Sequence, residues 1–157
     1  MRAVVQRVAS ARVEVAGEVI GAIDRGLLAY VGFGRGDTDA DSDWMLSKIL
    51  GLRIFADHTG TGKMARSIVD VGGALLLVSQ FTLYASLQRG RRPSFDEAMP
   101  PAEAEGAYEA FVRKARGRCE GNTRIETGRF GAEMLVSSVN DGPVTIWADS
   151  VVAIPRG

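Results

Sequence analysis

The sequence has very little of the residue types on which most metal-dependent and triad enzymes rely. Its 157 residues include one histidine, His58, and one cysteine, Cys119. A single cysteine excludes an intramolecular disulfide and a thiol pair for zinc, and it fits a reducing compartment. A single histidine excludes the HExxH pattern of zinc enzymes. We therefore expect no metal and no cofactor.

The scarcity of histidine also argues against a catalytic triad. Histidine is the usual general base of serine and cysteine hydrolases. His58 lies in the polar, glycine-rich segment Asp57 to Lys63, which is typical of an exposed turn. The glycines of Gly32 to Gly36 are similar to a nucleotide loop, but the segment lacks the third glycine of the dinucleotide fingerprint and the Lys-Ser/Thr of a P-loop. That segment predicts a tight turn.

The chain also lacks an excess of charge and a long apolar run. Nineteen lysines and arginines balance nineteen aspartates and glutamates, so no overall field attracts nucleic acid or a membrane. Any RNA contact must use a local patch. No stretch approaches the roughly 18 apolar residues of a membrane span, and the N-terminus has no signal-peptide pattern. We expect a cytoplasmic protein without a membrane partner.

The apolar residues that are present predict a single compact α/β domain over residues 1–157. This length is usual for one domain, and the N-terminal third, including Leu27 to Phe33, has the pattern of β-strands. Further strands are expected at 53–55, 74–78, 123–127, 134–139 and 144–147. Helices are expected after the acidic stretch 37–41 and from just after Pro101 to near Gly117.

The second predicted helix has an apolar face and a basic end. Its apolar positions are Ala104, Tyr108, Phe111, Val112 and Ala115. Basic side chains at the end of a helix interact favourably with its dipole, so we expect a structural role for the basic residues of its last turns. They are Arg113, Lys114, Arg116 and Arg118.

Two short segments carry the chemistry that the sequence suggests. Ser79-Gln80-Phe81-Thr82-Leu83-Tyr84 closes an apolar strand, and Asn140-Asp141-Gly142-Pro143-Val144-Thr145 predicts a turn between two strands. Both place exposed backbone amides and carbonyls beside small polar side chains. This arrangement suits a site that recognises an acyl group through main-chain atoms.

Together with four further segments, these two resemble the D-aminoacyl-tRNA deacylase family over nearly the whole chain. A Gly-Pro-Val-Thr sequence alone would be weak evidence, because Gly-Pro is a common turn dipeptide. The resemblance implies a curved or barrel-like mixed β-sheet with two main helices, in a homodimer. The further segments, in the order of the family, are Gln6-Arg7-Val8, Gly62-Lys63-Met64, Gly90-Arg91-Arg92-Pro93-Ser94-Phe95 and Thr127-Gly128-Arg129-Phe130-Gly131-Ala132.

The resemblance implies hydrolysis of the ester that joins a D-amino acid to the terminal ribose of tRNA. It also implies that each subunit lends Gly142 and Pro143, joined by a cis peptide bond, to the pocket of the other. Their carbonyls would exclude an L side chain by clash and desolvation, while a D side chain points to solvent. Glycine esters would then also be cleaved. The implied partners are aminoacyl-tRNA and a second copy of the chain, not DNA.

The first of the two segments would hold the reacting ester. The amides of Phe81 and Thr82 would polarise the carbonyl and hold the oxyanion, while Ser79 and Gln80 would shape the adenosine end. Two roles remain open for Thr82. Its hydroxyl could be the nucleophile, although no base is visible to activate it, or the 2′-hydroxyl of the RNA could activate the attacking water instead.

The resemblance assigns supporting roles to several other residues. Arg7 would fix the Gly-Pro loop through its guanidinium, although a surface arginine on an edge strand has the same pattern. Met134 would form a pocket wall, or belong to the core. Contacts with tRNA phosphates are expected from a set of basic residues that also fits a solvated loop: Arg89, Arg91, Arg92 and Lys63.

Three other functions fit parts of the sequence. A non-catalytic RNA-binding module would use the arginine loop, but it lacks the basic and aromatic surface of single-strand binders. A hydrolase of small D-amino acid esters or amides would lack a dedicated base or metal. A sister family cleaves misplaced L-alanine and is thought to use the trans form of the same dipeptide, but Gln6-Arg7-Val8 and Asn140-Asp141-Gly142-Pro143 favour the D-specific branch.

Overall fold

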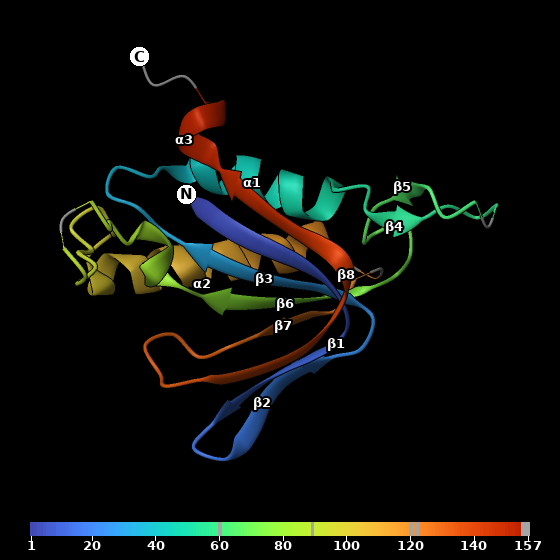
Figure 1. The fold of residues 1–157 in the computed structure, drawn as a ribbon, viewed down its shortest axis with the longest axis horizontal. Coiled ribbons are helices and arrows are strands. Elements are labelled where there is room, and N and C mark those ends of the chain that lie inside the picture. Colours follow the sequence, from blue (N-terminus) through green and yellow to red (C-terminus); the bar gives the residue numbers. More distant parts are fainter. Residues whose placement is uncertain (60, 89, 120, 122, 155–157) are drawn as a thin grey trace.

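A curved six-stranded sheet forms the centre of the molecule, and two long helices pack on one of its faces (Figure 1). This computed structural model describes residues 1–59, 61–88, 90–119, 121 and 123–154. No helix among them is long and apolar enough to cross a membrane. The elements are β1 (Arg2–Val15), β2 (Glu18–Ile23), β3 (Gly26–Gly32), α1 (Asp39–Gly51), β4 (Phe55–Ala56), β5 (Met64–Arg66), β6 (Ala74–Ser79), the 3₁₀-helix η1 (Phe81–Tyr84), α2 (Pro101–Arg118), β7 (Ile125–Thr127), β8 (Leu135–Asp149) and α3 (Ser150–Ala153).

The long strand β1 organises the sheet, because it pairs with three other strands. Its first half is antiparallel to β3 and its second half to β2, while β8 runs antiparallel along the other edge. β3, β6 and β7 are parallel to one another. The sheet curls until Arg124, just before β7, donates a 3.0 Å hydrogen bond to the carbonyl of Ala22 in β2. The predicted barrel-like mixed sheet is therefore confirmed.

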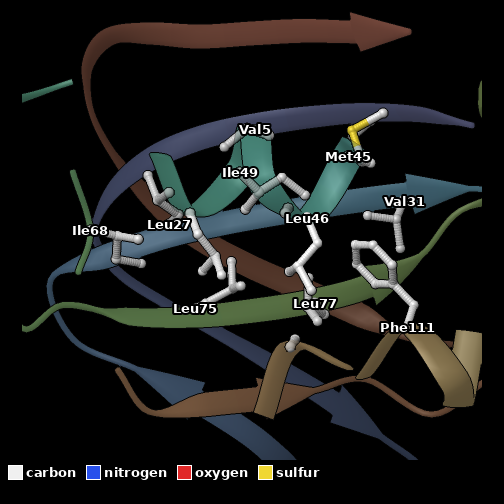
Figure 2. Close-up of a cluster of buried hydrophobic side chains, with 14 of the residues drawn as sticks. Val5, Leu27, Val31, Met45, Leu46, Ile49, Ile68, Leu75, Leu77 and Phe111 are labelled. Carbon is white, nitrogen blue, oxygen red and sulfur yellow. The ribbon is translucent and has the colours of Figure 1, made fainter. Parts of the chain in front are cut away.

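Alternating residues of the central strands divide the core between the two faces of the sheet. Leu27 and Val31 of β3, and Leu75 and Leu77 of β6, face the helices and are fully buried (Figure 2). Leu28 of β3, together with Leu76 and Val78 of β6, belongs to a second cluster inside the curl of the sheet. This period of two explains why β3 and β6 are apolar at nearly every position.

Both predicted main helices are present, and their buried residues follow the expected pattern. All five apolar positions of the predicted face of α2 are buried. α1 is preceded by Thr38, whose amide and hydroxyl donate to Asp41 Oδ2 at 2.8 and 2.9 Å. The cap of this helix is therefore the threonine rather than an aspartate of the acidic stretch. The chain also forms the short helix α3, which the sequence did not predict.

Two predictions about local structure are wrong. Arg53 and Ile54 lie outside the strands, because β4 begins only at Phe55. The predicted turn at 140–145 is part of one continuous strand, β8. Its pairing with β1 explains how this happens: Gln6 pairs with Thr145 and Val8 with Asn140, so residues 141–144 bulge out opposite Arg7 alone. Within this bulge, the peptide bond between Gly142 and Pro143 is cis.

A buried polar network joins the first residue of the described chain to α1 and to the end of β8. The ammonium group of Met1 donates to Asp37 Oδ1 at 2.7 Å and to Ser150 Oγ at 2.6 Å. Ser150 in turn donates to Asp41 Oδ1 at 2.6 Å. Ser150 is fully buried, so the start of the segment 149–157, to which the sequence assigned no role, anchors the start of β1 and the end of β8 to α1.

The charge of Asp41 stabilises this network at neutral pH. Burial acts to raise the pKa of Asp41, but hydrogen bonds from Ser150 and Thr38 and the Met1 ammonium outweigh it and lower the pKa from 3.8 to about 2. A carboxyl group with a lowered folded-state pKa stabilises the fold above its unfolded pKa, and this contribution disappears as the pH falls through the folded value. The relevant window is therefore about pH 4 to about pH 2.

We expect Asp41→Asn to lower the free energy of unfolding by about 2 kcal/mol at pH 7, because the charge-dependent part of these interactions is lost. The difference from wild type should shrink as the pH falls from about 4 to about 2. Urea unfolding at a series of pH values measures it. The control is Asp24→Asn, at an exposed position, with a change of about 0.5 kcal/mol or less. A difference for Asp41→Asn that does not vary with pH would contradict this account.

Candidate active site

A cavity of about 580 Å³ opens at the carboxyl ends of the parallel strands β3 and β6. Ser79, Gln80 and Phe81 line one wall, and Met134 lines another. The carboxyl ends of parallel strands are the usual position of ligand sites in α/β sheets. Four of the predicted site residues therefore lie around one cavity.

Much of the cavity wall is apolar and aromatic. Phe81, whose side chain is 57% exposed, packs edge-on against Phe95 with ring centroids 5.0 Å apart. Phe33 and Phe130 line the cavity as well. The sequence analysis missed Phe95, Phe33 and Phe130 as site residues. Phe95 and Phe130 lie in family-like segments, 90–95 and 127–132, where an aromatic residue within a matching segment was the available signal.

The turn after β6 presents two backbone amides without protein acceptors. The amide of Gln80 donates to the carbonyl of Val31 at 2.8 Å, which fixes the turn against the end of β3. In the part of the chain that the structure describes, no group accepts a hydrogen bond from the amides of Phe81 or Thr82. Such donors are available to a substrate oxygen.

Thr82 has a hydrogen-bond partner but no base. Gln80 Nε2 donates to Thr82 Oγ1. An amide group takes up no proton at neutral pH, so this contact does not activate the hydroxyl as a nucleophile. Because Oγ1 accepts this bond, its own hydrogen points elsewhere and is free to be donated. Among the described residues, no carboxylate or imidazole forms a hydrogen bond with Thr82.

Residues from one end of the β1–β8 pair, where β1 starts and β8 ends, hold η1 in place. Arg2 donates to the carbonyl of Leu83 at 3.1 Å and to Asp149 at 3.0 Å, and its guanidinium lies 4.3 Å from the centre of the Tyr84 ring. The Tyr84 hydroxyl is 3.2 Å from Asp37 Oδ2. Burial, followed by the negative charges of Asp37 and Asp149, raises the pKa of Tyr84 far above its usual range. The phenol therefore stays a neutral donor.

Arg7 and the Gly-Pro bulge lie midway along β1 and β8, near the amino end of β3. Arg7 Nε lies 3.0 Å from the carbonyl oxygen and 2.9 Å from a carboxylate oxygen of Asp141, and the same guanidinium donates to the carbonyl of Ile54. Arg7 pairs with Leu27, five residues before the cavity residue Gly32, which corresponds to about 17 Å along a strand. Gly142 and Pro143 are exposed. The cavity of the same chain lies at the carboxyl end of β3, whereas Arg7 pairs near the amino end of that strand.

The predicted phosphate contacts do not form one cluster. Arg91 and Arg92 are exposed in the loop between η1 and α2, whereas Lys63 is exposed just before β5, near the opposite side of the molecule in Figure 1. Arg89 lies outside the described residues. His58 is exposed beside Arg66, as expected for a turn.

A metal site is not apparent in the described part of the chain. No group of three or more histidine, cysteine, aspartate or glutamate side chains there is arranged to hold a metal ion. Cys119 is buried, and burial raises the pKa of its thiol. The polar side chains that line the cavity are those of Ser79, Gln80 and Arg35, beside aromatic rings.

Comparison with known proteins identifies the family to which this arrangement belongs. The family model described as D-Tyr-tRNA(Tyr) deacylase matches residues 4–149. The chain belongs to this family. A D-aminoacyl-tRNA deacylase of Desulfitobacterium hafniense (strain DSM 10664 / DCB-2) is 55% identical over 150 residues, which cover 96% of this chain and 97% of that protein. As a member of the deacylase family, the chain is a hydrolase that acts on ester bonds.

Solved structures agree with this deacylase fold. The structure of a protein named c-Myc DNA Unwinding Element Binding Protein has a TM-score of 0.89 and 43% identity, and covers 95% of this chain and 98% of its own. A structure described as that of a probable eukaryotic D-amino acid tRNA deacylase has a TM-score of 0.77, with coverages of 94% and 97%. At 20% identity, the second likeness supports the fold alone.

We expect Gly34→Ala to disturb the turn that carries the free amides. A Cβ at Gly34 would lie 2.5 Å from two ring carbons of the buried Tyr84, so the ring and the end of η1 must shift. Overpacking of this kind costs about 1–3 kcal/mol, and deacylase activity should fall with it. Denaturant unfolding and a deacylase assay measure both effects. Gly106→Ala, on α2 with open space around it, is the control and should equal or exceed wild-type stability. An unchanged Gly34→Ala variant would contradict the role of Tyr84.

Proposed function

We propose that the protein hydrolyses the ester of D-aminoacyl-tRNA at the cavity beside η1, releasing the free D-amino acid and tRNA. One observation carries the proposal: the amides of Phe81 and Thr82, which have no acceptor among the described residues, lie in the turn whose Phe81 lines an aromatic cavity, in a chain of the deacylase family. The aromatic wall suits the terminal adenosine, because every base has a face that stacks on aromatic rings. Ser79 and Gln80 supply polar contacts at the same wall.

The reaction needs little activation, because the substrate is an ester. Water attacks the carbonyl carbon, and the carbonyl oxygen becomes an oxyanion that the amides of Phe81 and Thr82 stabilise. Removing one such donor typically costs about 10²-fold or more in turnover. The bond between the carbonyl carbon and the ribose 3′-oxygen then breaks, and a proton moves to that oxygen. No metal or cofactor takes part.

The base for this reaction comes from the RNA rather than from the protein. The Thr82 hydroxyl accepts a hydrogen bond from the carboxamide of Gln80, and a carboxamide cannot take up the proton that a nucleophilic hydroxyl must lose. The ribose 2′-hydroxyl lies next to the ester and is available to position or activate the water. Thr82 then acts as a hydrogen-bond donor, and Gln80 orients it.

Selection of the D-isomer requires a second copy of the chain. The exposed bulge at Gly142 and Pro143 lies too far along β1 to reach the cavity of its own chain. β8 offers a surface for a partner: apart from β1, no described strand pairs with it, and Leu135, Val139 and Trp147 on this strand are each more than half exposed. In a homodimer, the partner's bulge reaches the cavity and its carbonyls exclude L side chains.

Arg7 is a positioning residue for this bulge. Its guanidinium contacts both the carbonyl and the carboxylate of Asp141, while Asn140 Nδ2 donates to the carbonyls of Arg7 and Val144 at 2.9 and 3.2 Å. Met134 forms the cavity wall near the amino acid. Arg89, Arg91, Arg92 and Lys63 contact tRNA phosphates, and Lys63 does so from a separate patch. The substrate places this single-domain protein in the cytoplasm.

The proposed function predicts rapid release of the amino acid from D-tyrosyl-tRNA and glycyl-tRNA, with L-tyrosyl-tRNA left intact. Glycine has no side chain to clash with the carbonyls of Gly142 and Pro143. The assay uses purified protein treated with a metal chelator and substrates of matched tRNA. Cleavage of the L ester would contradict the chirality mechanism, and cleavage of none of the three would contradict the function.

The proposed mechanism predicts that Thr82→Ala keeps turnover within about 10-fold of wild type, because one hydrogen bond is lost and no nucleophile. Placing the D-amino acid on a terminal 2′-deoxyadenosine should cost about 10²-fold or more. Single-turnover kinetics measure both, with Thr82→Ser as the control that keeps the hydroxyl. Loss of all activity in Thr82→Ala, with full activity on the 2′-deoxy substrate, would make Thr82 the nucleophile.

A further inference from the structure

A second cavity, of about 410 Å³, lies between α2 and the segment that follows β7. It adjoins the first cavity, because Phe130 lines both. Along α2, Ala104 lines the first cavity, and Tyr108, one turn further along the helix, lines the second. A ligand that fills the first cavity can therefore continue into the second along one side of the helix.

The floor of the second cavity is firmly built. The rings of Tyr108 and Phe130 pack with centroids 6.0 Å apart. The Tyr108 hydroxyl and the amide of Gly128 each donate to the carbonyl of Leu77 at 2.9 Å. Burial raises the pKa of Tyr108 to about 12, so its hydroxyl keeps this bond at neutral pH. Tyr108 is thus held at a fixed position, with Phe130 packed against it.

Three arginines surround this floor, and two of them have no side-chain partner among the described residues. Arg113 lies 3.7 Å from Glu109, with both side chains more than 60% exposed, so the pair is weak. No hydrogen bond or ion pair joins the side chains of Arg116 and Arg129 to another described residue, and both arginines are exposed. Glu105 also lines the cavity. Within the described part of the chain, the site thus has two guanidinium groups and one carboxylate that form no ion pair.

The other basic residues at the end of α2 have a structural role that separates them from this site. Lys114 forms ion pairs with Asp39 at 3.0 Å and with Asp43 at 3.2 Å, and Arg118 forms one with Asp43 at 2.8 Å. These contacts join α2 to α1. The structural role predicted for the basic end of the helix therefore holds for Lys114 and Arg118. Arg116 takes no part in it.

We propose that the second cavity binds backbone phosphates of the tRNA acceptor strand through Arg116 and Arg129, with Arg113 in support. The proposal rests on the proposed function, which places the aminoacylated adenosine in the first cavity. The strand must leave that cavity with its phosphates exposed, and the arginines lie directly beside it. A guanidinium matches a phosphate through two parallel hydrogen bonds. The RNA exit thus runs along α2, in addition to any contact with the loop at Arg91 and Arg92.

The test measures KM and kcat of one double variant, which combines Arg116→Glu with Arg129→Glu, on two substrates. For D-tyrosyl-tRNA we expect the KM to rise about 10-fold or more while kcat stays within about 2-fold, because phosphate contacts supply binding and not chemistry. For 3′-O-(D-tyrosyl)adenosine, which has no phosphate, we expect no change in either constant. A variant that is merely misfolded would lose both activities. The slope of log KM against the logarithm of the salt concentration should become smaller by about 1.4, because two phosphate contacts are lost.

Two further double variants, which change the net charge by the same amount, show whether the effect on KM depends on the position of the substituted residues. Lys48→Glu with Arg53→Glu changes exposed residues on and after α1 and should leave both substrates unaffected. Arg91→Glu with Arg92→Glu probes the loop. An unchanged KM in the Arg116 and Arg129 variant would overturn the proposal, whether or not the loop variant binds tRNA more weakly. If wild-type protein cleaves neither substrate, the proposed function itself fails, so the two failures are distinct.

Discussion

The pairing of β1 with β8 is the constraint on which the rest of the structure depends. The two strands run antiparallel over nearly their whole length, and their register shifts where residues 141–144 oppose Arg7 alone. The backbone groups of a bulge leave the ladder, so they need other partners or must face outward. Arg7 and Asn140 hold the sides of this bulge, and its tip at Gly142 and Pro143 is exposed.

This pairing sets the bulge midway along β1 and β8, away from the cavity at the carboxyl ends of β3 and β6. At the end near Met1, Arg2 binds the carbonyl of Leu83 and packs on Tyr84, so η1 is fixed by the same strand that pairs with the bulged strand. A rigid sheet of this kind keeps the two parts of the site apart within one chain. It also fixes their relative geometry, so a second copy related by two-fold symmetry can bring a bulge to each cavity at a defined angle. The cost is a long exposed edge strand, which a partner subunit would cover.

Periodicity predicted most of the fold, because the apolar faces of β3, β6 and α2 alternate or repeat in the way that burial requires. It failed at residues 140–145, where Gly-Pro suggested a turn. The strand continues there because Asn140 and Arg7 replace the lost ladder bonds, and these contacts lie more than 130 residues apart in sequence. The segment 79–84 was found from sequence, but Phe95 and Phe130 reach the cavity only through tertiary packing. The distinction between Arg116, which has no side-chain partner among the described residues, and Lys114, which binds α1, likewise depends on how two helices meet.

The central claim is that the bulge of one chain completes the cavity of another, and mixing two defective variants tests it most directly. One variant carries Ala132→Trp, which fills the cavity, and the other carries Gly142→Ala, whose Cβ would lie 2.6 Å from Asn140 Oδ1. Ala132→Trp alone should cleave neither ester, and Gly142→Ala alone should cleave both, because its bulge no longer excludes L side chains. After the two are unfolded together and refolded, mixed dimers separated from the homodimers should each contain one intact site, which cleaves D esters with about half of wild-type activity and rejects L esters. Mixed dimers that form and remain inactive, or a monomeric wild type that still separates D from L esters, would contradict the account.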